Sequence, residues 1–437
     1  MFGTSGIRGE FGVDVTTDLA LSVGRALAAE GAERIVVGRD PRTTGQLLAD
    51  AVSAGAREGG SDVTRLGVAA TPSIARGVGW YEADAGVAVT ASHNPPKDNG
   101  IKLWNPSGQA FDERQRAAIT ERIQTDAPAR RSWRDVGTET TVGDVNDRHA
   151  SVLSEQGQDL DGLEVVVDVG NGAGAVTAEA LRRRGASVRT LDAQQDGHFP
   201  GREIEPTEEA LPDLQHVVAA CDADLGVAHD GDADRMVAIT GTGEYVPGDV
   251  LLALFARAEA SEGDRVAAPI NTSMLVDDVL ESVGASVVRT RVGDVYVAEA
   301  ATAHDVVFGG EPSGAWIWPA ETLCPDGPMA AVRLAASVAR NGPLSDTVAA
   351  VGAYPTYRDA VPVDDREVTM NRVERVLRER FEPVDDTDGI RVATDDGWFL
   401  VRASGTQPLV RVTAEAETET RAEKLFEEAR SIVDESV

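Results

Sequence analysis

Short apolar runs alternate with amphipathic stretches along most of the chain, and this alternation predicts the elements of the fold. The apolar runs within 33–40, 84–89 and 163–168 are typical of strands that are buried on both faces. Between such runs, apolar residues recur at helical spacing in 18–30 and 46–58, and glycine follows each of these two stretches. Strands that alternate with helices in this way predict an α/β fold.

The alternation divides the chain into three segments of similar build and a different last segment. We expect four domains, at residues 1–142, 143–246, 247–351 and 352–437. A polar stretch at 127–141 is expected to link the first two domains. The last segment shows two strands around a loop in 391–416 and then a helix from Glu419. We therefore predict three similar α/β domains and a smaller C-terminal α+β domain.

Acidic residues far outnumber basic ones, since the chain has 73 aspartates and glutamates, 41 lysines and arginines, and a net charge of −32. Only Lys97, Lys102 and Lys424 are lysines. An acidic, lysine-poor chain indicates a halophilic protein, because at about 1 M salt the Debye length falls to roughly 3 Å and self-repulsion is screened. An ordinary acidic enzyme is the alternative. The negative surface should repel nucleic acid and anionic membranes, so we expect neither as a partner.

No sequence feature indicates secretion or a membrane. Two cysteines, Cys221 and Cys324, are too few for a disulfide framework, as expected in a reducing interior. No apolar run approaches the roughly 18 residues that span a membrane, and the N-terminal MFGTSGIRGEFG lacks a signal peptide's apolar core. We expect a soluble cytoplasmic protein, with monomer and homodimer both open.

The segment TASHNPPKDNG, residues 90–100, follows an apolar strand at 85–89 and places Ser92 next to His93. A serine beside a histidine suggests a nucleophile and its base. Neighbouring side chains on an extended backbone point to opposite faces, however, so we expect His93 not to deprotonate Ser92. Another group must activate Ser92.

Three aspartates in DGDADR, residues 230–235, are the strongest local signal of chemistry. Asp230, Asp232 and Asp234 alternate with small residues directly after an apolar strand, so an extended backbone would turn all three carboxylates the same way. Carboxylates this close repel one another, and Mg²⁺, which takes carboxylate, phosphate and water oxygens, is the natural counterion. The sequence therefore predicts a magnesium site, with a solvated acidic turn as the alternative.

Isolated basic residues on this acidic chain predict sites for an anionic substrate. Lys97 lies within the segment that follows the strand at 85–89, residues 90–100, which we call the serine loop, and Lys102 lies just after it. Arg8 lies in the glycine-rich TSGIRG. Arg402 and Arg411 flank the segment SGTQP. Cations beside exposed glycine-rich loops reverse the local charge and so attract an anion.

The segment RASGTQP, residues 402–408, suits a phosphate group. Arg402 can bond two phosphate oxygens at once. The hydroxyls of Ser404 and Thr406 and the backbone amides around Gly405 can bind the remaining oxygens.

Two further turns are less informative. Glu311 and Ser313 in GEPSG could hold two adjacent sugar hydroxyls. The turn GNGAG at 170–174 matches a dinucleotide-binding fingerprint poorly, so we interpret it as a tight turn between a strand and a helix.

Five motifs together resemble the α-D-phosphohexomutase family. They occur in the family's order and at about its spacing, and they are FGTSGIRG, TASHNPPKDNGIK, DGDADR, GEPSG and RASGTQPLVRV. The resemblance covers essentially the whole chain and implies three related α/β domains and a C-terminal domain around a central cleft. It implies that Ser92 carries the transferable phosphate, and that the three aspartates hold Mg²⁺ together with this serine.

The same resemblance implies how the substrate, a hexose phosphate or bisphosphate, is bound and converted. Glu311 and Ser313 would contact the sugar, and its phosphate would be bound by Arg402, Ser404, Gly405, Thr406 and Arg411. Phosphoserine would give its phosphoryl group to a free sugar hydroxyl, and the resulting bisphosphate would turn over and return its other phosphate. Positioning and charge stabilisation would supply the catalysis.

The resemblance also indicates candidate catalytic side chains. Lys102 matches the lysine of the family's NGxK segment and is the candidate general acid or base. Arg8 and His93 are further catalytic candidates, with His93 expected to orient the loop or contact phosphate.

The choice of sugar is less marked in the sequence. RVGDVYVAE at 291–299 resembles phosphoglucosamine mutases and their archaeal relatives, whereas many bacterial phosphomannomutases have histidine in place of Asp294. GEPSG departs at its third position from GEMSG and GEQSG, and Gln407 replaces the glutamate common after SGT. We predict glucosamine phosphate, with mannose or glucose phosphate as the alternative.

Two other classes of function stay open. The Asp-x-Asp pattern in DGDAD is typical of phosphatases with an aspartate nucleophile, in which Asp230 or Asp232 would be phosphorylated and Ser92 dispensable. The second is a sensor that binds sugar phosphate without converting it, and the complete set of motifs disfavours it.

Overall fold

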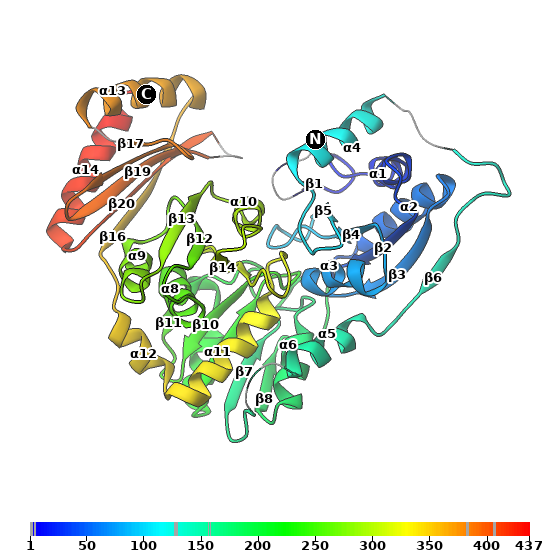
Figure 1. The fold of residues 1–437 in the computed structure, drawn as a ribbon, viewed down its shortest axis with the longest axis horizontal. Helices are drawn as coiled ribbons and strands as arrows, with labels where there is room; N and C mark the ends of the chain where they lie inside the picture. The colour runs from blue at the N-terminus through cyan, green and yellow to red at the C-terminus, as the bar shows by residue number, and fades with distance from the viewer. Residues whose placement is uncertain are drawn as a thin grey trace. The chain divides into compact units, whose positions relative to one another are not determined.

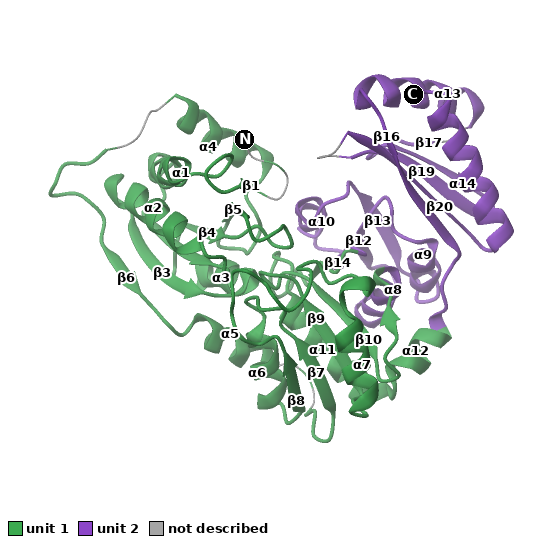
Figure 2. Cartoon of the chain, turned by 180° about the vertical axis from the view of Figure 1, so that it is seen from behind, with its two compact units in different colours: residues 1–248, 313–350 green, residues 249–312, 351–437 purple. Residues whose placement is uncertain are grey.

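The chain forms two compact units, which Figure 2 shows in different colours. Unit 1 combines residues 1–248 with 313–350, and unit 2 combines 249–312 with 351–437. The computed structural model describes residue 3 and residues 6–125, 130–155, 157, 159–381, 384–404 and 408–437. Among these residues, no helix combines the length and the apolar character that crossing a membrane requires.

The first sheet of unit 1 has six strands in the order β1-β5-β4-β2-β3-β6 (Figure 1). Its strands and helices are β1 (Ile7–Glu10), α1 (Thr17–Ala29), β2 (Arg34–Arg39), α2 (Gly45–Glu58), β3 (Asp62–Val68), α3 (Thr71–Trp80), β4 (Ala85–Val89), β5 (Asp98–Trp104), α4 (Glu113–Gln124) and β6 (Glu139–Thr141). Helices α1, α2 and α4 pack on one face of this sheet, and α3 packs on the other. β4 runs parallel to β2, and β5 returns antiparallel to β4.

The second sheet of unit 1 has the strand order β11-β10-β9-β7-β8. The elements of this part are α5 (Val145–Ser154), β7 (Glu164–Asp168), α6 (Ala175–Arg183), β8 (Ser187–Leu191), α7 (Pro212–Ala220), β9 (Leu225–His229), β10 (Met236–Thr240), β11 (Tyr245–Val246), β15 (Trp316–Ile317), α11 (Gly327–Asn341) and α12 (Leu344–Val351). Helix α7 packs on one face of the sheet, and α11 contacts α6, β9 and β10.

Unit 2 contains a parallel sheet and a separate antiparallel sheet. The parallel sheet has the order β13-β12-β14, and the antiparallel sheet has the order β16-β20-β19-β18-β17. The elements are α8 (Gly248–Glu259), β12 (Arg265–Pro269), α9 (Met274–Glu281), β13 (Ser286–Thr290), α10 (Asp294–Ala300), β14 (Val306–Gly310), β16 (Thr356–Pro362), α13 (Arg366–Arg380), β17 (Val384–Asp385), β18 (Ile390–Thr394), β19 (Gly397–Ala403), β20 (Leu409–Ala416) and α14 (Glu419–Asp434). Helices α13 and α14 cover one face of the antiparallel sheet.

Burial explains why the central strands are continuous apolar runs. Every residue of β4 and of β9 is buried, because helices cover both faces of a largely parallel sheet. Polar residues appear where these strands end, and such strand ends are where open α/β sheets usually bind ligands. The sequence puts the serine loop after β4, and it puts DGDADR, residues 230–235, which we call the acidic loop, after β9.

The predicted α/β fold is confirmed, and the helices expected at 18–30 and 46–58 are present as α1 and α2. Two local predictions differ from the structure. The last three residues of the expected linker at 127–141 form β6, which pairs with β3. The segment 391–416 contains three strands instead of two, because a turn between Thr394 and Gly397 folds β18 and β19 into a hairpin. The boundaries of the four predicted domains stay predictions.

Candidate active site

Ser92 lies in the loop after β4, and the loop holds it in an unusual backbone conformation. Its φ angle is 52°, in the left-handed region that residues other than glycine rarely adopt. Its N–H donates to the Thr90 hydroxyl at 2.9 Å, and the residue is 1% exposed. Such local strain around a buried hydroxyl is typical of functional sites.

His93 lies closer to Ser92 than we predicted from an extended backbone. Its Nδ1 is 3.3 Å from Ser92 Oγ. The extended backbone that we assumed is absent, because Ser92 adopts a left-handed conformation that changes the direction of the next side chain. The expectation that His93 does not deprotonate Ser92 stays a prediction. Burial, together with the positive charges of Arg235 and Arg8, lowers the pKa of His93 to about 2. A neutral imidazole at this distance can orient the serine hydroxyl.

The three aspartates of the acidic loop lie together between β9 and β10. One oxygen from each of Asp230, Asp232 and Asp234 lies within 4.8 Å of the others, and all three residues are buried. The clustering agrees with the sequence, but the extended backbone that we expected to cause it is absent. Ala233 has a φ of 57°, so the loop turns instead of continuing β9.

Ser92 contacts this acidic loop directly. Ser92 Oγ donates to Asp230 Oδ2 at 2.5 Å, and the N–H of Arg235 donates to Asp230 Oδ1 at 3.2 Å. Burial and the negative charges of Asp234 and Asp232 raise the pKa of Asp230 well above its usual range. Asp230 is therefore the hydrogen-bond acceptor of the serine hydroxyl, a partner that the sequence did not identify.

Lys102 reaches the acidic loop from β5. Its Nζ donates to Asp232 Oδ2 at 2.9 Å and to Asp234 Oδ2 at 2.5 Å, and the residue is 6% exposed. Thr71, the first residue of α3, donates its hydroxyl to Asp232 at 2.7 Å. Burial alone would raise the pKa of Asp232, but Lys102 and Thr71 outweigh burial and hold this pKa below its usual range.

The acidic loop suits a hard metal cation. Asp232 Oδ1 is buried, yet no described residue donates a hydrogen bond to it. A buried carboxylate oxygen without a partner costs free energy, and a cation bound there would remove that cost. The candidate donors are carboxylate oxygens alone, which are the ligands that Mg²⁺ and Ca²⁺ prefer. The residues present therefore fit the metal that the sequence predicted.

Arg8 also belongs to this cluster, whereas Lys97 does not. Arg8 lies on β1 opposite Gly100 of β5, and its Nε is buried without an acceptor in the described part of the chain. Its positive charge contributes to the lowered pKa values of His93 and Asp232. Lys97 is exposed and pairs with Glu10 at 2.6 Å instead.

Arg42 organises the serine loop, a role that its sequence context did not predict. Its guanidinium donates to four backbone carbonyls of the loop at distances from 2.7 to 3.0 Å, those of Ser92, Asn94, Pro95 and Asp98. Its Nε pairs with Asp40 at 2.9 Å, and both side chains are fully buried. Asp40 in turn accepts the Thr90 hydroxyl at 2.7 Å. The signal that could have found it is an arginine two residues after an aspartate, directly after β2 at the same sheet edge.

His229 and the turn after β7 both contact the backbone of the acidic loop and support it. His229 Nδ1 lies 2.8 Å from the Arg235 carbonyl, and its Nε2 lies 2.8 Å from the Thr177 hydroxyl. In the GNGAG turn, a side chain on Gly172 would place its Cβ 2.6 Å from the Gly231 carbonyl oxygen. This turn therefore packs on the acidic loop, in agreement with its interpretation as a tight turn.

A later part of unit 1 packs against the same loop. A side chain on Gly327, the first residue of α11, would place its Cβ 2.4 Å from the Arg235 carbonyl oxygen. The preceding residue, Asp326, accepts hydrogen bonds from Arg76 at 3.0 Å and lies 3.2 Å from His149 Nε2. All three side chains are largely or fully buried. The start of α11 is thus fastened to α3 and α5 while it supports the acidic loop.

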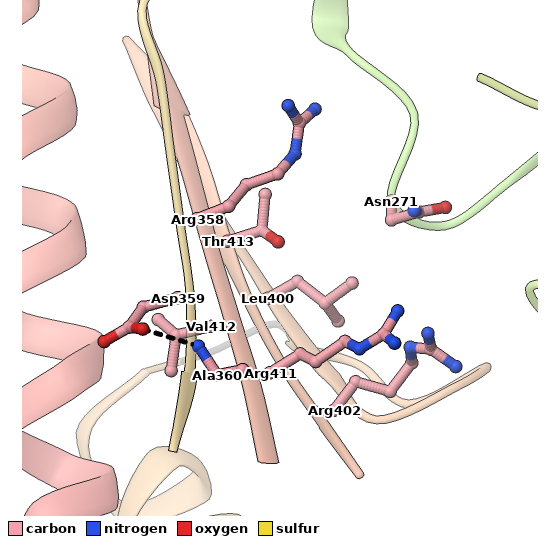
Figure 3. A pocket seen from close by; sticks show the side chains of 9 residues that line it. All are labelled: Asn271, Arg358, Asp359, Ala360, Leu400, Arg402, Arg411, Val412 and Thr413. Carbon is pink, nitrogen blue, oxygen red and sulfur yellow. Dashed lines mark hydrogen bonds between the residues drawn. The ribbon is translucent and has the colours of Figure 1, made fainter. Parts of the chain in front are cut away.

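The predicted phosphate-binding residues that the structure describes lie in unit 2. Arg402 and Arg411 line a pocket of about 400 Å³ (Figure 3), and they stand opposite each other on β19 and β20. Ser404 is buried directly after β19. Gly405 and Thr406 lie outside the described residues.

The two predicted sugar-binding residues of GEPSG differ in exposure. Glu311 is 8% exposed and accepts the N–H of Gly293 at 2.7 Å. Ser313 is exposed. Glu311 belongs to unit 2 and Ser313 to unit 1.

Four family models match successive parts of the chain. They describe the α/β/α domains I, II and III and the C-terminal domain of phosphoglucomutase/phosphomannomutase, and they match residues 1–130, 146–243, 247–354 and 360–432.

Several known proteins resemble the whole chain. It is 45% identical over 440 residues to a "Probable phosphoglucosamine mutase" of Methanopyrus kandleri, which covers 99% of this chain and 97% of the relative. A protein of the same name from Methanothermobacter thermautotrophicus is 44% identical over 443 residues, at 99% and 98% coverage. The crystal structure of a phosphoglucomutase/phosphomannomutase family protein from Burkholderia thailandensis matches with a TM-score of 0.88 and 25% identity, covering 100% of this chain and 98% of that one.

Proposed function

Because the chain belongs to the phosphoglucomutase/phosphomannomutase family along nearly its whole length, we propose that it interconverts glucosamine 6-phosphate and glucosamine 1-phosphate. Its class of reaction is intramolecular phosphoryl transfer. The choice of glucosamine is supported by two archaeal relatives with phosphoglucosamine mutase in their names and by the VGD segment at 292–294. Mannose or glucose phosphate is the alternative substrate.

The observation that carries the mechanism is the contact between Ser92 and the acidic loop. A buried serine hydroxyl lies 2.5 Å from Asp230, within a cluster that also holds Lys102 and Arg8. Lys102 and Arg8, together with a cation held by the three aspartates, would supply the positive charge that a phosphate on Ser92 needs. A hydrolase would instead need a base to activate the serine, and the pKa of His93 is lowered to about 2.

In the proposed reaction, the phosphoryl group moves between Ser92 Oγ and a sugar hydroxyl. The P–O bond at phosphorylated Ser92 breaks as a P–O bond to the sugar oxygen forms, and the proton that the sugar hydroxyl loses ends on the Ser92 oxygen that leaves. After the bisphosphate turns over, its other phosphoryl group returns to Ser92. In this scheme Ser92 Oγ is the protein atom that bonds to phosphorus, and its neighbours contribute most of the rate through positioning and charge stabilisation.

Each residue of the cluster has a proposed part in this transfer. Lys102 donates to two carboxylates, and such an ammonium suits a proton donor or an electrostatic stabiliser better than a base. Arg8 offers an unpaired buried Nε to a phosphate oxygen. His93, neutral and near Ser92 Oγ, orients the serine.

We further propose that Asp230, Asp232, Asp234 and the phosphorylated Ser92 hold Mg²⁺. When bound, the ion would supply positive charge that offsets the charge of the transferred phosphate. The buried aspartate cluster and its unpaired oxygen support this assignment.

Replacing Asp232 by asparagine should weaken Mg²⁺ binding at least about tenfold, because one charged oxygen donor becomes a neutral amide. Two quantities are measured for each variant. One is the rise in melting temperature with Mg²⁺ concentration, and the other is the mutase activity. Asp213→Asn, an exposed change in the first turn of α7, is the matched control. Unchanged stabilisation by Mg²⁺ in Asp232→Asn, or full activity in excess chelator, would contradict the metal assignment.

We assign the binding of the sugar phosphate to the residues that the sequence singled out in unit 2 and at its border. Arg402, Arg411, Ser404, Gly405 and Thr406 would bind the phosphate that is not being transferred, and Glu311 and Ser313 would bind the sugar. The pocket at Arg402 and Arg411 supports the first part of this assignment.

The sugar is tested by comparing rates on the 1- and 6-phosphates of glucosamine, mannose and glucose, with a trace of bisphosphate present. We expect the highest kcat/KM for glucosamine phosphate, and a clear preference for mannose or glucose phosphate would overturn that choice. The halophilic character that the composition indicates stays a prediction, so the rates should be measured at low and at molar salt.

A further inference from the structure

One face of the C-terminal sheet carries three guanidinium groups. Arg402 of β19 stands directly opposite Arg411 of β20, and Arg411 stands opposite Ala360 of β16. Arg358 lies two positions before Ala360, so its side chain is on the same face. Figure 3 shows the three arginine side chains lining one pocket.

This face has more positive charge than its own residues balance. Arg402 pairs with Asp388 and Arg358 pairs with Asp249, each at 3.3 Å. Among the described residues, none pairs with the guanidinium of Arg411, which is exposed. Like charges directly opposite each other destabilise a sheet, and the chain as a whole has a net charge of −32. A bound anion would remove this local conflict.

The rest of the pocket suits a small polar anion. Leu400 lines the pocket and packs with Ile270 and Trp398. This apolar contact holds the sheet rigid beneath the guanidinium groups. Asn271 lines the pocket from the loop after β12, and no described residue donates to its buried Oδ1. Its amide can turn and offer N–H donors to a ligand.

We propose that Arg358 is a third phosphate-binding side chain of this pocket, beside Arg402 and Arg411. The proposal rests on the proposed function, in which the pocket holds the phosphate that is not being transferred. The side chain of Arg358 is 59% exposed and uses a single N–H on Asp249, so most of its five donors are available. Arg358 takes no part in bond making, and its effect is on the affinity for phosphate.

The test compares Arg358→Gln with Arg375→Gln, which removes the same charge from an exposed position on α13. We expect Arg358→Gln to raise KM about tenfold for both sugar phosphates, because one charge-assisted contact is lost, with kcat within about twofold. The KM of Arg358→Lys should lie between those of the wild type and of Arg358→Gln, since lysine keeps the charge but not the two-pronged contact. Arg402→Gln should raise KM for the sugar phosphates more than Arg358→Gln does.

A second measurement needs no turnover. At constant ionic strength, inorganic phosphate should raise the melting temperature of the wild type and of Arg375→Gln, and clearly less that of Arg358→Gln. If Arg358→Gln matches Arg375→Gln in both KM and the phosphate-induced shift, Arg358 is not a phosphate ligand. A wild type without mutase activity would overturn the proposed function, yet the phosphate-induced shift would still decide the part of Arg358.

Discussion

Replacing Ser92 by alanine should lower turnover by about four orders of magnitude or more while leaving the protein folded. The hydroxyl that carries the phosphoryl group is lost, and neither Asp230 nor His93 can take its place at the same point. The fold should survive because Arg42 binds the backbone carbonyl of residue 92 and not its side chain. The measurements are the mutase rate in both directions and the phosphate content of the intact protein.

A matched control for this substitution is Ser107→Ala, at an exposed serine after β5, which should keep both activity and phosphate. Wild-type protein should carry phosphate on Ser92. Phosphate on Asp230 or Asp232, together with full activity of Ser92→Ala, would favour a phosphatase with an aspartate nucleophile over the mutase.

Replacing Arg42 by methionine should lower both stability and activity. Removing one partner of the buried pair leaves Asp40 without its countercharge, which typically costs about 3–5 kcal/mol. The four carbonyls that Arg42 binds also lose their donor, so the serine loop should shift. A misplacement of about 1 Å can cost about 100-fold in rate. Chemical denaturation measures the first effect, and kcat measures the second.

The double substitution Arg42→Met with Asp40→Asn separates these two effects. It removes both charges, so much of the lost stability should return. Activity should stay low, because no guanidinium then positions the loop. Arg42→Lys should also stay poorly active, since one ammonium cannot serve four carbonyls at once. If the double variant regains full activity together with stability, Arg42 contributes to stability only and does not position the serine loop.

The sequence predicted the chemistry that is written in short, adjacent stretches. The acidic loop, Ser92 and Lys102 follow or lie on apolar strands, and the rule that ligands bind where strands end places each of them at the ligand-binding edge of its own sheet. That they act together was implied by the resemblance to the phosphohexomutase family, since β4 and β9 belong to different sheets. The α/β fold follows from the same alternation of strands and helices.

Residues that act through tertiary contacts could not be predicted in this way. Arg42 resembles any arginine in a loop until its four carbonyl partners are known. Thr71 begins a helix that we did not predict, and it touches Asp232 across a separation of 161 residues. The position of His93 depends on the left-handed φ of Ser92, and no local pattern indicates that a serine will adopt it. Backbone geometry and long-range pairing therefore account for these differences.

The order in which the ribosome makes the chain gives the split of unit 1 a further consequence. The acidic loop is synthesised with the first part of the unit, but Gly327 and Asp326 follow only after residues 249–312. Asp326 must then find Arg76 and His149 across separations of 250 and 177 residues. Contacts this distant in sequence form slowly. A nascent chain that has reached residue 248 therefore holds its three aspartates without the helix that supports them, and the site can be completed only late in synthesis.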